Sequence, residues 1–265
     1  MKLRDMAGSW ALVSGASSGI GREFCVQLAA AGADLVLVAR RQELLDELAA
    51  ELGRRHGVRC AVVAIDLTEP NAPARLKARL DELKIHPRLL VNNAGSGHWG
   101  AFSGATPAAY EKMMTLNVVV PTLLSRVFHD DLVANSPSGV INVSSPAVFQ
   151  PVPYMAAYAA SKAALHSLSL ALSEEWRSEG IHVQTLVPAP TESEFDARAG
   201  AYESQLDSRR DPPATVVARS LAALETGEVL VSTAKGTYQQ RFFGALFPAK
   251  FVVAKVAEMF RPKKP

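Results

Sequence analysis

The hydrophobic pattern alternates short apolar runs with longer segments of helical periodicity. Runs such as Leu35–Val38 are apolar at consecutive positions, as expected for strands that are buried on both faces of a parallel sheet. The segments between them, such as Gln42–His56 and Pro73–Leu83, are rich in Leu, Ala, Glu and Arg and favour helices. Strands that alternate with helices predict right-handed βαβ units. The predicted strands are Trp10–Ser14, Ala33–Ala39, Arg59–Ile65, Leu89–Asn92, Val140–Val143, Ile181–Val187 and Glu228–Val231.

Length and composition narrow the class of protein. The 265 residues fit one large α/β domain, and no linker or repeat interrupts the pattern before residue 190. We therefore predict a single doubly wound, Rossmann-type domain over residues 1–234, with a seven-stranded parallel sheet and helices on both faces. A net charge of +2 argues against a strongly basic nucleic-acid binder. No apolar run reaches about 18 residues, and no apolar segment follows the charged N-terminus, so neither a spanning helix nor a secretory signal is expected.

The two cysteines, Cys25 and Cys60, are too few for a disulfide framework and lack metal-ligand spacing. We therefore expect a reduced cytoplasmic protein without a metal site.

A glycine-rich turn follows the first predicted strand. It reads Gly15-x3-Gly19-x-Gly21 and leads into a predicted helix, Arg22–Ala31. A turn of this kind lets backbone N–H groups approach a pyrophosphate at the N-terminus of a helix. The spacing differs from the general G-x-G-x-x-G fingerprint. The context favours a nucleotide site, and a merely structural turn is the alternative.

With this spacing the chain resembles the short-chain dehydrogenase/reductase (SDR) family, in its single-domain branch. The other motifs of that family follow in order over about residues 8–232: Asn92-Asn93-Ala94-Gly95, Asn117, Ser144-Ser145, and Tyr158-x3-Lys162, which begins 13 residues after Ser145. The resemblance implies an oxidoreductase that transfers hydride between a nicotinamide cofactor and a carbonyl or alcohol. The alternatives are an NAD-linked hydroxyl dehydrogenase and a catalytically idle NADP-binding interaction protein.

The end of the second strand indicates which cofactor is used. A carboxylate there would hold the ribose 2′-OH of NAD, but this chain has Ala39 followed by Arg40, whose guanidinium suits the 2′-phosphate of NADP. We predict NADP(H) rather than NAD(H); alternatively, Arg40 and Arg41 are a solvated helix start. The other cofactor-binding residues that the resemblance implies are Gly15, Ser17, Ser18, Gly19, Ile20, Gly21, Asp66, Leu67, Asn93, Ala94, Gly95, Tyr158, Lys162, Pro188, Thr191 and Ser193.

Tyr158 and Lys162 lie four residues apart on a predicted helix, Ala156–Glu179, and so share a face. An ammonium near a phenol lowers its pKa from about 10, which suits a proton donor. The resemblance implies the same roles, with Ser145 binding the substrate carbonyl oxygen and Asn117 holding a water in a proton relay. The alternatives are a packed tyrosine beside a surface lysine, and an asparagine that bends its helix.

The sequence also bears on the substrate pocket and on the oligomeric state. Trp99, Phe149, Tyr154 and Phe195 fall in loops at the carboxyl ends of strands and would line a pocket for a hydrophobic carbonyl compound, unless they fill the core. Residues 193–213 match the variable substrate lid of the family. The resemblance also implies a homodimer or homotetramer through the helix that carries Tyr158.

The last part of the chain, residues 235–265, is a basic extension. It has seven Lys/Arg against one acid, Glu258. Pro248 can start a helix, with an apolar stripe of Leu246, Ala249, Val253, Val256 and Phe260. A basic amphipathic helix can lie on an anionic membrane, and it can equally pack on its own protein or on a second subunit.

Overall fold

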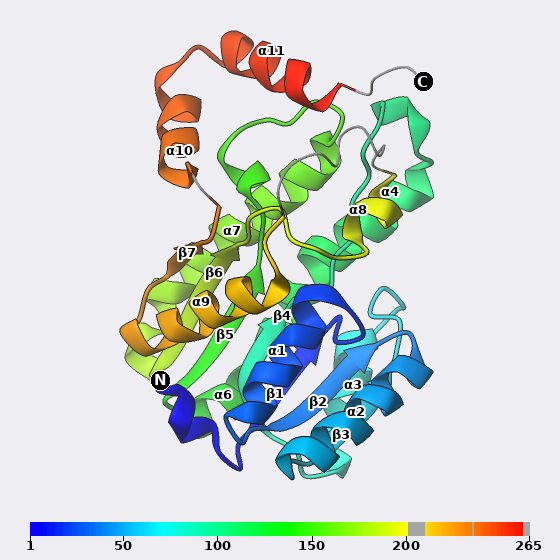
Figure 1. Ribbon diagram of the computed structural model, residues 1–265, viewed down its shortest axis with the longest axis vertical. Coiled ribbons are helices and arrows are strands. Elements are labelled where there is room, and N and C mark those ends of the chain that lie inside the picture. The colour runs from blue at the N-terminus through cyan, green and yellow to red at the C-terminus, as the bar shows by residue number, and fades with distance from the viewer. Residues whose placement is uncertain (201–209, 235, 262–265) are drawn as a thin grey trace.

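The computed structural model, which describes residues 1–200, 210–234 and 236–261, contains a seven-stranded sheet in which neighbouring strands are all parallel (Figure 1). The order β3-β2-β1-β4-β5-β6-β7 confirms the predicted doubly wound fold. The chain builds outward from β1 to β3 and then restarts on the other side of β1, which leaves a crevice at the carboxyl ends of β1 and β4. The strands are β1 Trp10–Ser14, β2 Asp34–Ala39, β3 Cys60–Ala64, β4 Pro87–Asn92, β5 Ser138–Val143, β6 Ile181–Val187 and β7 Leu230–Ser232.

Helices cover both faces of the sheet. One face carries α1 (Gly19–Ala30), α2 (Gln42–His56) and α9 (Pro213–Thr226), and the other carries α3 (Ala72–Glu82), α5 (Val120–Val127) and α7 (Ala156–Glu175). The shorter helices are α4 Pro107–Met114, α6 His129–Ala134 and α8 Phe195–Ala199, and the chain continues into α10 Thr237–Leu246 and α11 Ala249–Phe260.

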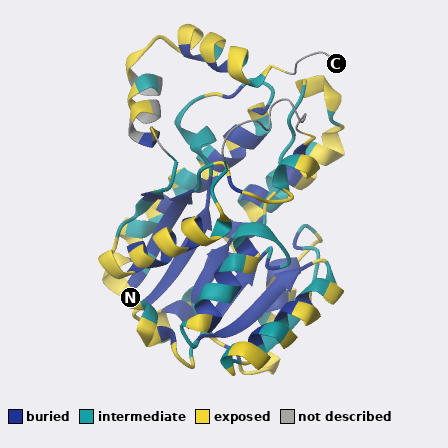
Figure 2. Ribbon diagram, viewed as in Figure 1, coloured by how far each residue is buried: buried dark blue, intermediate teal, exposed yellow. Residues whose placement is uncertain are grey.

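The two-sided core explains the uninterrupted apolar runs. Leu35 and Leu37 of β2 belong to the core on the α1 side, whereas Val36 and Val38 belong to the core on the α3 side. Successive side chains of a strand point to opposite faces, so a strand with helices on both faces has no polar side. The sheet is buried accordingly, and exposed residues gather on the outer sides of the helices (Figure 2).

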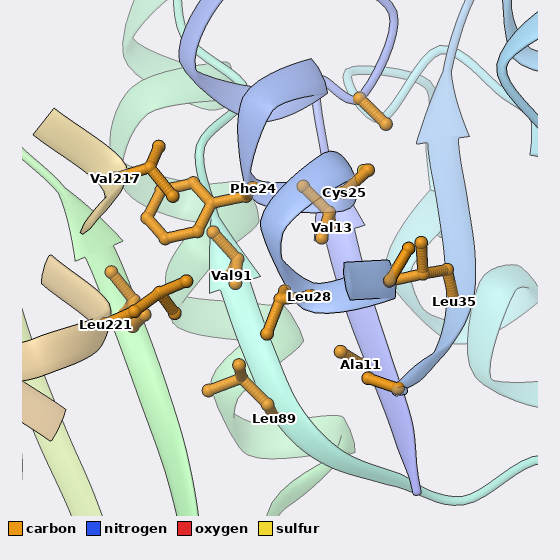
Figure 3. Packing of buried hydrophobic residues seen from close by; sticks show 14 of the residues in the cluster. Ala11, Val13, Phe24, Cys25, Leu28, Leu35, Leu89, Val91, Val217 and Leu221 are labelled. Atoms are coloured by element: carbon orange, nitrogen blue, oxygen red, sulfur yellow. The ribbon is translucent and has the colours of Figure 1, made fainter. Parts of the chain in front are cut away.

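Helices α1 and α9 meet above the centre of the sheet. Phe24 and Leu28 of α1 pack with Val217 and Leu221 of α9, over Val91 of β4 (Figure 3). This packing fixes α1, and therefore its N-terminus, above the crevice between β1 and β4.

A chain of buried amide hydrogen bonds fixes α7 against the sheet. Asn92 Nδ2 of β4 donates to Asn142 Oδ1 of β5 (2.8 Å), and Asn142 Nδ2 donates to Ser169 Oγ of α7 (2.9 Å). Buried polar groups are costly unless they are paired. This pairing therefore favours a single position of α7 on the sheet.

The C-terminal extension folds back over the site end of the protein, as α10 and α11 (Figure 1). The predicted helix start at Pro248 agrees with α11. Of the predicted apolar stripe, Val256 is buried and Phe260 packs against the same cluster, but Leu246 is not part of it. Leu246 is 74% exposed and belongs to α10, and the buried residues of α11 are Val252 and Val256. The reason is that Phe247 is extended (φ −98°, ψ 150°), so the two helices do not share an axis. Among the described residues, no helix is long and apolar enough to cross a membrane.

Candidate active site

A cavity of about 1480 Å³ opens at the carboxyl ends of the strands. Single-ligand pockets usually have about 300–1,000 Å³, so this one has room for a dinucleotide and a second molecule. Most of the predicted site residues line it: Gly15, Ser17, Ser18, Gly19, Ile20, Arg40, Asp66, Leu67, Asn93, Ala94, Gly95, Trp99, Ser145, Tyr158, Lys162, Pro188, Thr191, Ser193 and Phe195.

The glycine-rich turn and the Asn93 motif are packed directly against each other. Ser14 Oγ accepts hydrogen bonds from the backbone N–H groups of Asn93 (3.0 Å) and Ala94 (3.1 Å). A Cβ atom added to Gly21 would lie 2.2 Å from the carbonyl oxygen of Gly15 and 2.4 Å from Asn93 Nδ2. Gly21 therefore does not line the cavity; it allows α1 to approach the turn closely, and so positions the N-terminus of α1 at the cavity.

Asp66 lines the cavity just after the end of β3. Its carboxylate accepts hydrogen bonds from the backbone N–H (3.0 Å) and Oγ1 (2.6 Å) of Thr68, and from Lys112 Nζ of α4 (2.9 Å). Partial burial acts to raise the pKa of Asp66, but the hydrogen bonds from Thr68 and Lys112 outweigh it and lower the pKa to about 2. The carboxylate is therefore ionised at neutral pH. Sequence reasoning missed Lys112, because nothing local connects it to the third strand.

Two arginines stand at the end of β2. Arg40 lines the cavity and is exposed, as the prediction of a phosphate contact requires. Arg41 lines it too, and its guanidinium donates to Ser17 Oγ (2.9 Å) and to the carboxylate of Glu194 (3.1 Å). The sequence pattern indicated only Arg40 as the phosphate contact, with a solvated helix start for Arg40 and Arg41 as the alternative. The contact of Arg41 with Ser17 joins segments 24 positions apart, so no local pattern pointed to it.

Tyr158 and Lys162 project from α7 into the middle of the cavity, and both are buried. Lys162 Nζ donates to the carbonyl oxygen of Val143 (2.9 Å) and lies 6.0 Å from the centre of the Tyr158 ring. A hydrogen bond joins the side chains of Tyr158 and Ser145. Ser144, in contrast, donates to the carbonyl of Lys162 (3.2 Å) and ties α7 to the end of β5.

Burial dominates the electrostatics of this pair. It raises the pKa of Tyr158 to about 12, against the hydrogen bond to Ser145, which acts to lower it; Asp196 adds to the increase. Burial also lowers the pKa of Lys162 to about 8. The expectation that the lysine depresses the tyrosine pKa is therefore wrong for this arrangement, because burial sets the direction of the shift and the ammonium, 6.0 Å from the ring, is not among its causes. At neutral pH the phenol carries its proton.

Asn117 lies in a π-helical turn, Thr115–Val119, between α4 and α5. Its Oδ1 accepts from the backbone N–H of Ser96 (3.0 Å), and its Nδ2 donates to the carbonyl of Ser96 and to Ser161 Oγ (both 2.9 Å). Its partners come from other segments, so it is not a local helix-bending residue. A Cβ atom on Gly95 would lie 3.3 Å from both Asn117 Oδ1 and Lys162 Nζ, so the glycine lets both groups approach the same loop.

The loop after β6 closes the cavity over the glycine-rich turn. Thr191 Oγ1 donates to the carbonyl of Ala189 (2.6 Å), and Ser193 Oγ accepts from the backbone N–H of Phe195 (3.3 Å). A Cβ atom on Gly19 would lie 3.1 Å from Ser193 Cβ. The loop therefore touches the glycine-rich turn. Residues 201–209 of the predicted lid lie outside the described residues.

The predicted substrate residues divide into two groups. Trp99 and Phe195 line the cavity, and the Phe195 ring lies 5.3 Å from that of Tyr158. Phe149 and Tyr154 do not line it. The Phe149 ring packs edge-on against His166 (5.7 Å), and Tyr154, with φ +66°, lines a separate small pocket beside His98. Sequence reasoning missed apolar lining from distant segments: Met113, Val152, Met155, Met259 and Phe260.

One cluster of potential metal ligands is found in the described part of the chain, away from this cavity. It consists of Asp81, His86 and Asp131. Lys77 Nζ is already paired with Asp81 and with Asp131 (3.3 Å), so an ammonium neutralises the cluster.

The close packing of Gly21 makes a matched pair of substitutions informative. Gly21→Ala forces its methyl group into the backbone of Gly15, and we expect it to cost about 1–3 kcal/mol of stability and to weaken nucleotide binding. Gly53→Ala in α2 meets only the carbonyl of Val58, at 3.6 Å, and should stabilise the protein by about 0.5–1 kcal/mol. Thermal unfolding and cofactor titration check both; equal effects at the two positions would contradict this account of the turn.

Comparison with known proteins agrees with the motifs. The family model described as short chain dehydrogenase matches residues 9–204. A very-long-chain 3-oxoacyl-CoA reductase of Bos taurus is 31% identical over 185 residues, or 68% of this chain and 59% of that protein, so this chain aligns with about three fifths of its relative.

Two solved structures are similar. One is a short-chain dehydrogenase from Sphingobium yanoikuyae in complex with NADPH (32% identity, TM-score 0.80, 89% of this chain and 93% of that one). The other is a bulky-bulky ketone specific alcohol dehydrogenase from Comamonas testosteroni (26%, TM-score 0.76, 97% and 95%). The chain belongs to the short-chain dehydrogenase family.

Proposed function

We propose that this chain is an NADP(H)-dependent oxidoreductase that interconverts a hydrophobic ketone and its secondary alcohol. The observation that carries the proposal is the meeting of Ser145, Tyr158 and Lys162 in one cavity with a glycine-rich nucleotide cradle. The NADPH complex of the Sphingobium relative and the ketone specificity of the Comamonas relative support it.

The described residues fit a nicotinamide dinucleotide. Its pyrophosphate would be held by the backbone N–H groups of the turn at the N-terminus of α1, where Gly15 and Gly19 have positive φ angles of 70° and 54°. Arg40 would hold a 2′-phosphate, with Arg41 beside it. When bound, the cofactor supplies the hydride that reduces the carbonyl carbon.

The side chains of α7 and β5 would handle the oxygen atom of the substrate. Ser145 would donate a hydrogen bond to the carbonyl oxygen and stabilise the negative charge that develops on it. Tyr158 would donate the phenolic proton to this oxygen, so that the ketone leaves as the neutral alcohol. Burial keeps the phenol protonated until that moment, because it raises the pKa of Tyr158 to about 12. Lys162, as an ammonium, would stabilise the phenolate that remains, and the Asn117 segment would carry the replacement proton inward.

Two alternatives have less support. An NAD-linked hydroxyl dehydrogenase would place a carboxylate at the end of β2, where this chain has Ala39. An idle binding protein would have no need for a buried lysine next to a buried tyrosine, since burying a charge is costly.

Tyr158→Phe tests the chemical role. It removes the only proton that the proposed donor carries, so we expect the turnover of ketones to fall at least about 10³-fold, whereas NADPH binding stays within twofold. Tyr154→Phe is the matched control, because this tyrosine lies four residues upstream and outside the cavity lining. Stopped-flow NADPH oxidation and fluorescence titration give the two readouts; retained turnover in Tyr158→Phe would refute the mechanism.

Arg40→Ala tests the choice of cofactor. Loss of a charge-assisted contact to the 2′-phosphate should weaken NADPH binding about tenfold and leave NADH binding unchanged. Arg54→Ala, an exposed arginine elsewhere on α2, is the control. Titrations of each variant with NADPH and with NADH measure the two affinities. An equal loss of affinity for both cofactors would mean that Arg40 does not contact the 2′-phosphate.

We propose further that the chain forms a homodimer or homotetramer through α5 and α7. Their outer faces expose Leu123 (43%) and Leu170 (40%), with Val119 (47%) at the start of α5, and apolar patches of this kind favour subunit contacts. Leu170→Glu should lower the mass measured by light scattering, whereas Leu83→Glu, at a similarly exposed leucine that follows α3, should not. A monomeric parent protein would overturn the proposal.

The outward side of α10 and α11 is proposed to contact an anionic membrane surface, as a peripheral site on a cytoplasmic enzyme. Residues 236–261 carry four Lys/Arg against one Glu, and they expose Phe242 (65%), Leu246 (74%) and Phe247 (47%). Apolar side chains among basic ones are typical of interfacial helices.

The protein should co-sediment with phosphatidylserine vesicles and not with phosphatidylcholine vesicles. Leu246→Glu should reduce binding to phosphatidylserine vesicles, and Leu83→Glu should not. If vesicle binding changes neither with the charge of the lipid nor with Leu246→Glu, this contact is excluded.

A further inference from the structure

The last turn of α11 forms part of the cavity wall. Glu258, Met259, Phe260 and Arg261 all line the cavity, although the chain reaches them about 100 residues after Tyr158. Figure 1 shows α11 crossing above α7 at the site end of the molecule. The substrate end is therefore closed by a segment beyond the matched family region, which ends at residue 204.

Two sets of contacts hold this wall in place. The first is apolar: Val252 and Val256 are buried in a cluster that also contains Met155 and Tyr158. The second joins Trp99 to Phe260, since the indole Nε1 donates to the Phe260 carbonyl oxygen (3.0 Å) and the two rings lie 5.2 Å apart. Because Trp99 itself lines the cavity, this contact fixes Phe260 at the substrate end.

The wall carries two charged residues, Glu258 and Arg261, next to a group of apolar and aromatic ones. Trp99, Phe195 and Phe260 contribute rings, and Met113, Val152, Met155 and Met259 contribute aliphatic surface. The polar groups for a carbonyl oxygen, Ser145 and Tyr158, lie on one side of this space. Methionine side chains adapt their shape to irregular apolar groups, and aromatic rings favour other rings.

We propose that Met259 and Phe260, held by Trp99, determine substrate specificity by forming the subsite for a bulky apolar substituent of the ketone. The inference rests on the proposed function and deepens it, because it assigns the substrate class: ketones with an aryl or branched apolar group next to the carbonyl. Trp99 acts in part as a positioning residue, through the backbone of Phe260.

A pair of tryptophan substitutions tests the subsite. Met259 and Leu246 are exposed to the same extent (73% and 74%) in the same C-terminal segment, but only Met259 lines the cavity. Met259→Trp should fill the subsite and lower the ratio of kcat/KM for benzophenone to kcat/KM for 2-butanone about tenfold. Leu246→Trp should leave this ratio unchanged. A ratio that Met259→Trp does not move, or that both variants move equally, overturns the inference.

Trp99→Phe tests the positioning contact. It keeps a ring in the wall and removes the N–H that binds the Phe260 carbonyl. A hydrogen bond contributes about 1 kcal/mol, so the KM for benzophenone should rise about fivefold with a smaller change in kcat. A loss confined to kcat, with KM unchanged, would contradict the positioning role.

A binding experiment separates this inference from the proposed function. Benzophenone is titrated calorimetrically into Tyr158→Phe, and into the same variant carrying Met259→Trp or Leu246→Trp. Weaker binding with Met259→Trp alone supports the subsite even if the parent protein reduces no ketone, in which case only the proposed reaction fails. Equal binding by all three proteins, or no binding by any, overturns the subsite.

Discussion

Parallel pairing of β1, β4, β5 and β6 is the constraint on which the site depends. Each strand ends at the same edge of the sheet, so motifs that are scattered over nearly 180 residues of sequence are brought into one cavity. The hydrogen bonds from Asn93 and Ala94 to Ser14 Oγ then join the ends of β1 and β4 at the point where the strand order reverses. Together with the strand pairing, this junction holds the cradle at the N-terminus of α1 in a fixed relation to the residues of α7.

Burial then decides the protonation states at the centre. Tyr158 and Lys162 have similar ordinary pKa values, and loss of solvation moves them in opposite directions, because it disfavours the anion of one and the cation of the other. The tyrosine pKa rises to about 12 and the lysine pKa falls to about 8. Near neutral pH the phenol therefore keeps its proton while most of the lysine remains charged. A protonated phenol can donate its proton to a carbonyl oxygen, whereas a phenolate has none to donate, so this combination suits a proton donor.

The sequence allowed the fold and the centre of the site to be predicted because both depend on local patterns. Trp10–Ser14 and Ile181–Val187 are strands with the predicted bounds, and the glycine spacing and Tyr158-x3-Lys162 each lie within a few consecutive residues. Side-chain contacts between distant segments could not be predicted in this way. Lys112 of α4 donates a hydrogen bond to Asp66, which follows β3, and Trp99 donates one to Phe260, 161 positions away in the chain.

The wrong predictions have the same cause, because contacts between distant segments do not follow from local sequence patterns. Phe149 was assigned to the pocket because of its loop, but its ring faces His166. The stripe in the C-terminal extension included Leu246, whereas the extended backbone at Phe247 leaves that residue on a separate helix, α10. The pKa of Tyr158 was judged from its neighbour four residues away, although burial, a property of the whole fold, is the largest cause of its shift.

The indole of Trp99 gives the protein an optical reporter of its own. Of the three tryptophans in the sequence, Trp10 lies under Arg59 (5.0 Å) and Trp176 beside His129 (4.9 Å), each in the sheet-and-helix body. Trp99 alone among them donates its N–H to the C-terminal helix. Indole emission depends on hydrogen bonding and on exposure to water, so the emission wavelength of Trp99 reports its contact with Phe260 without any label.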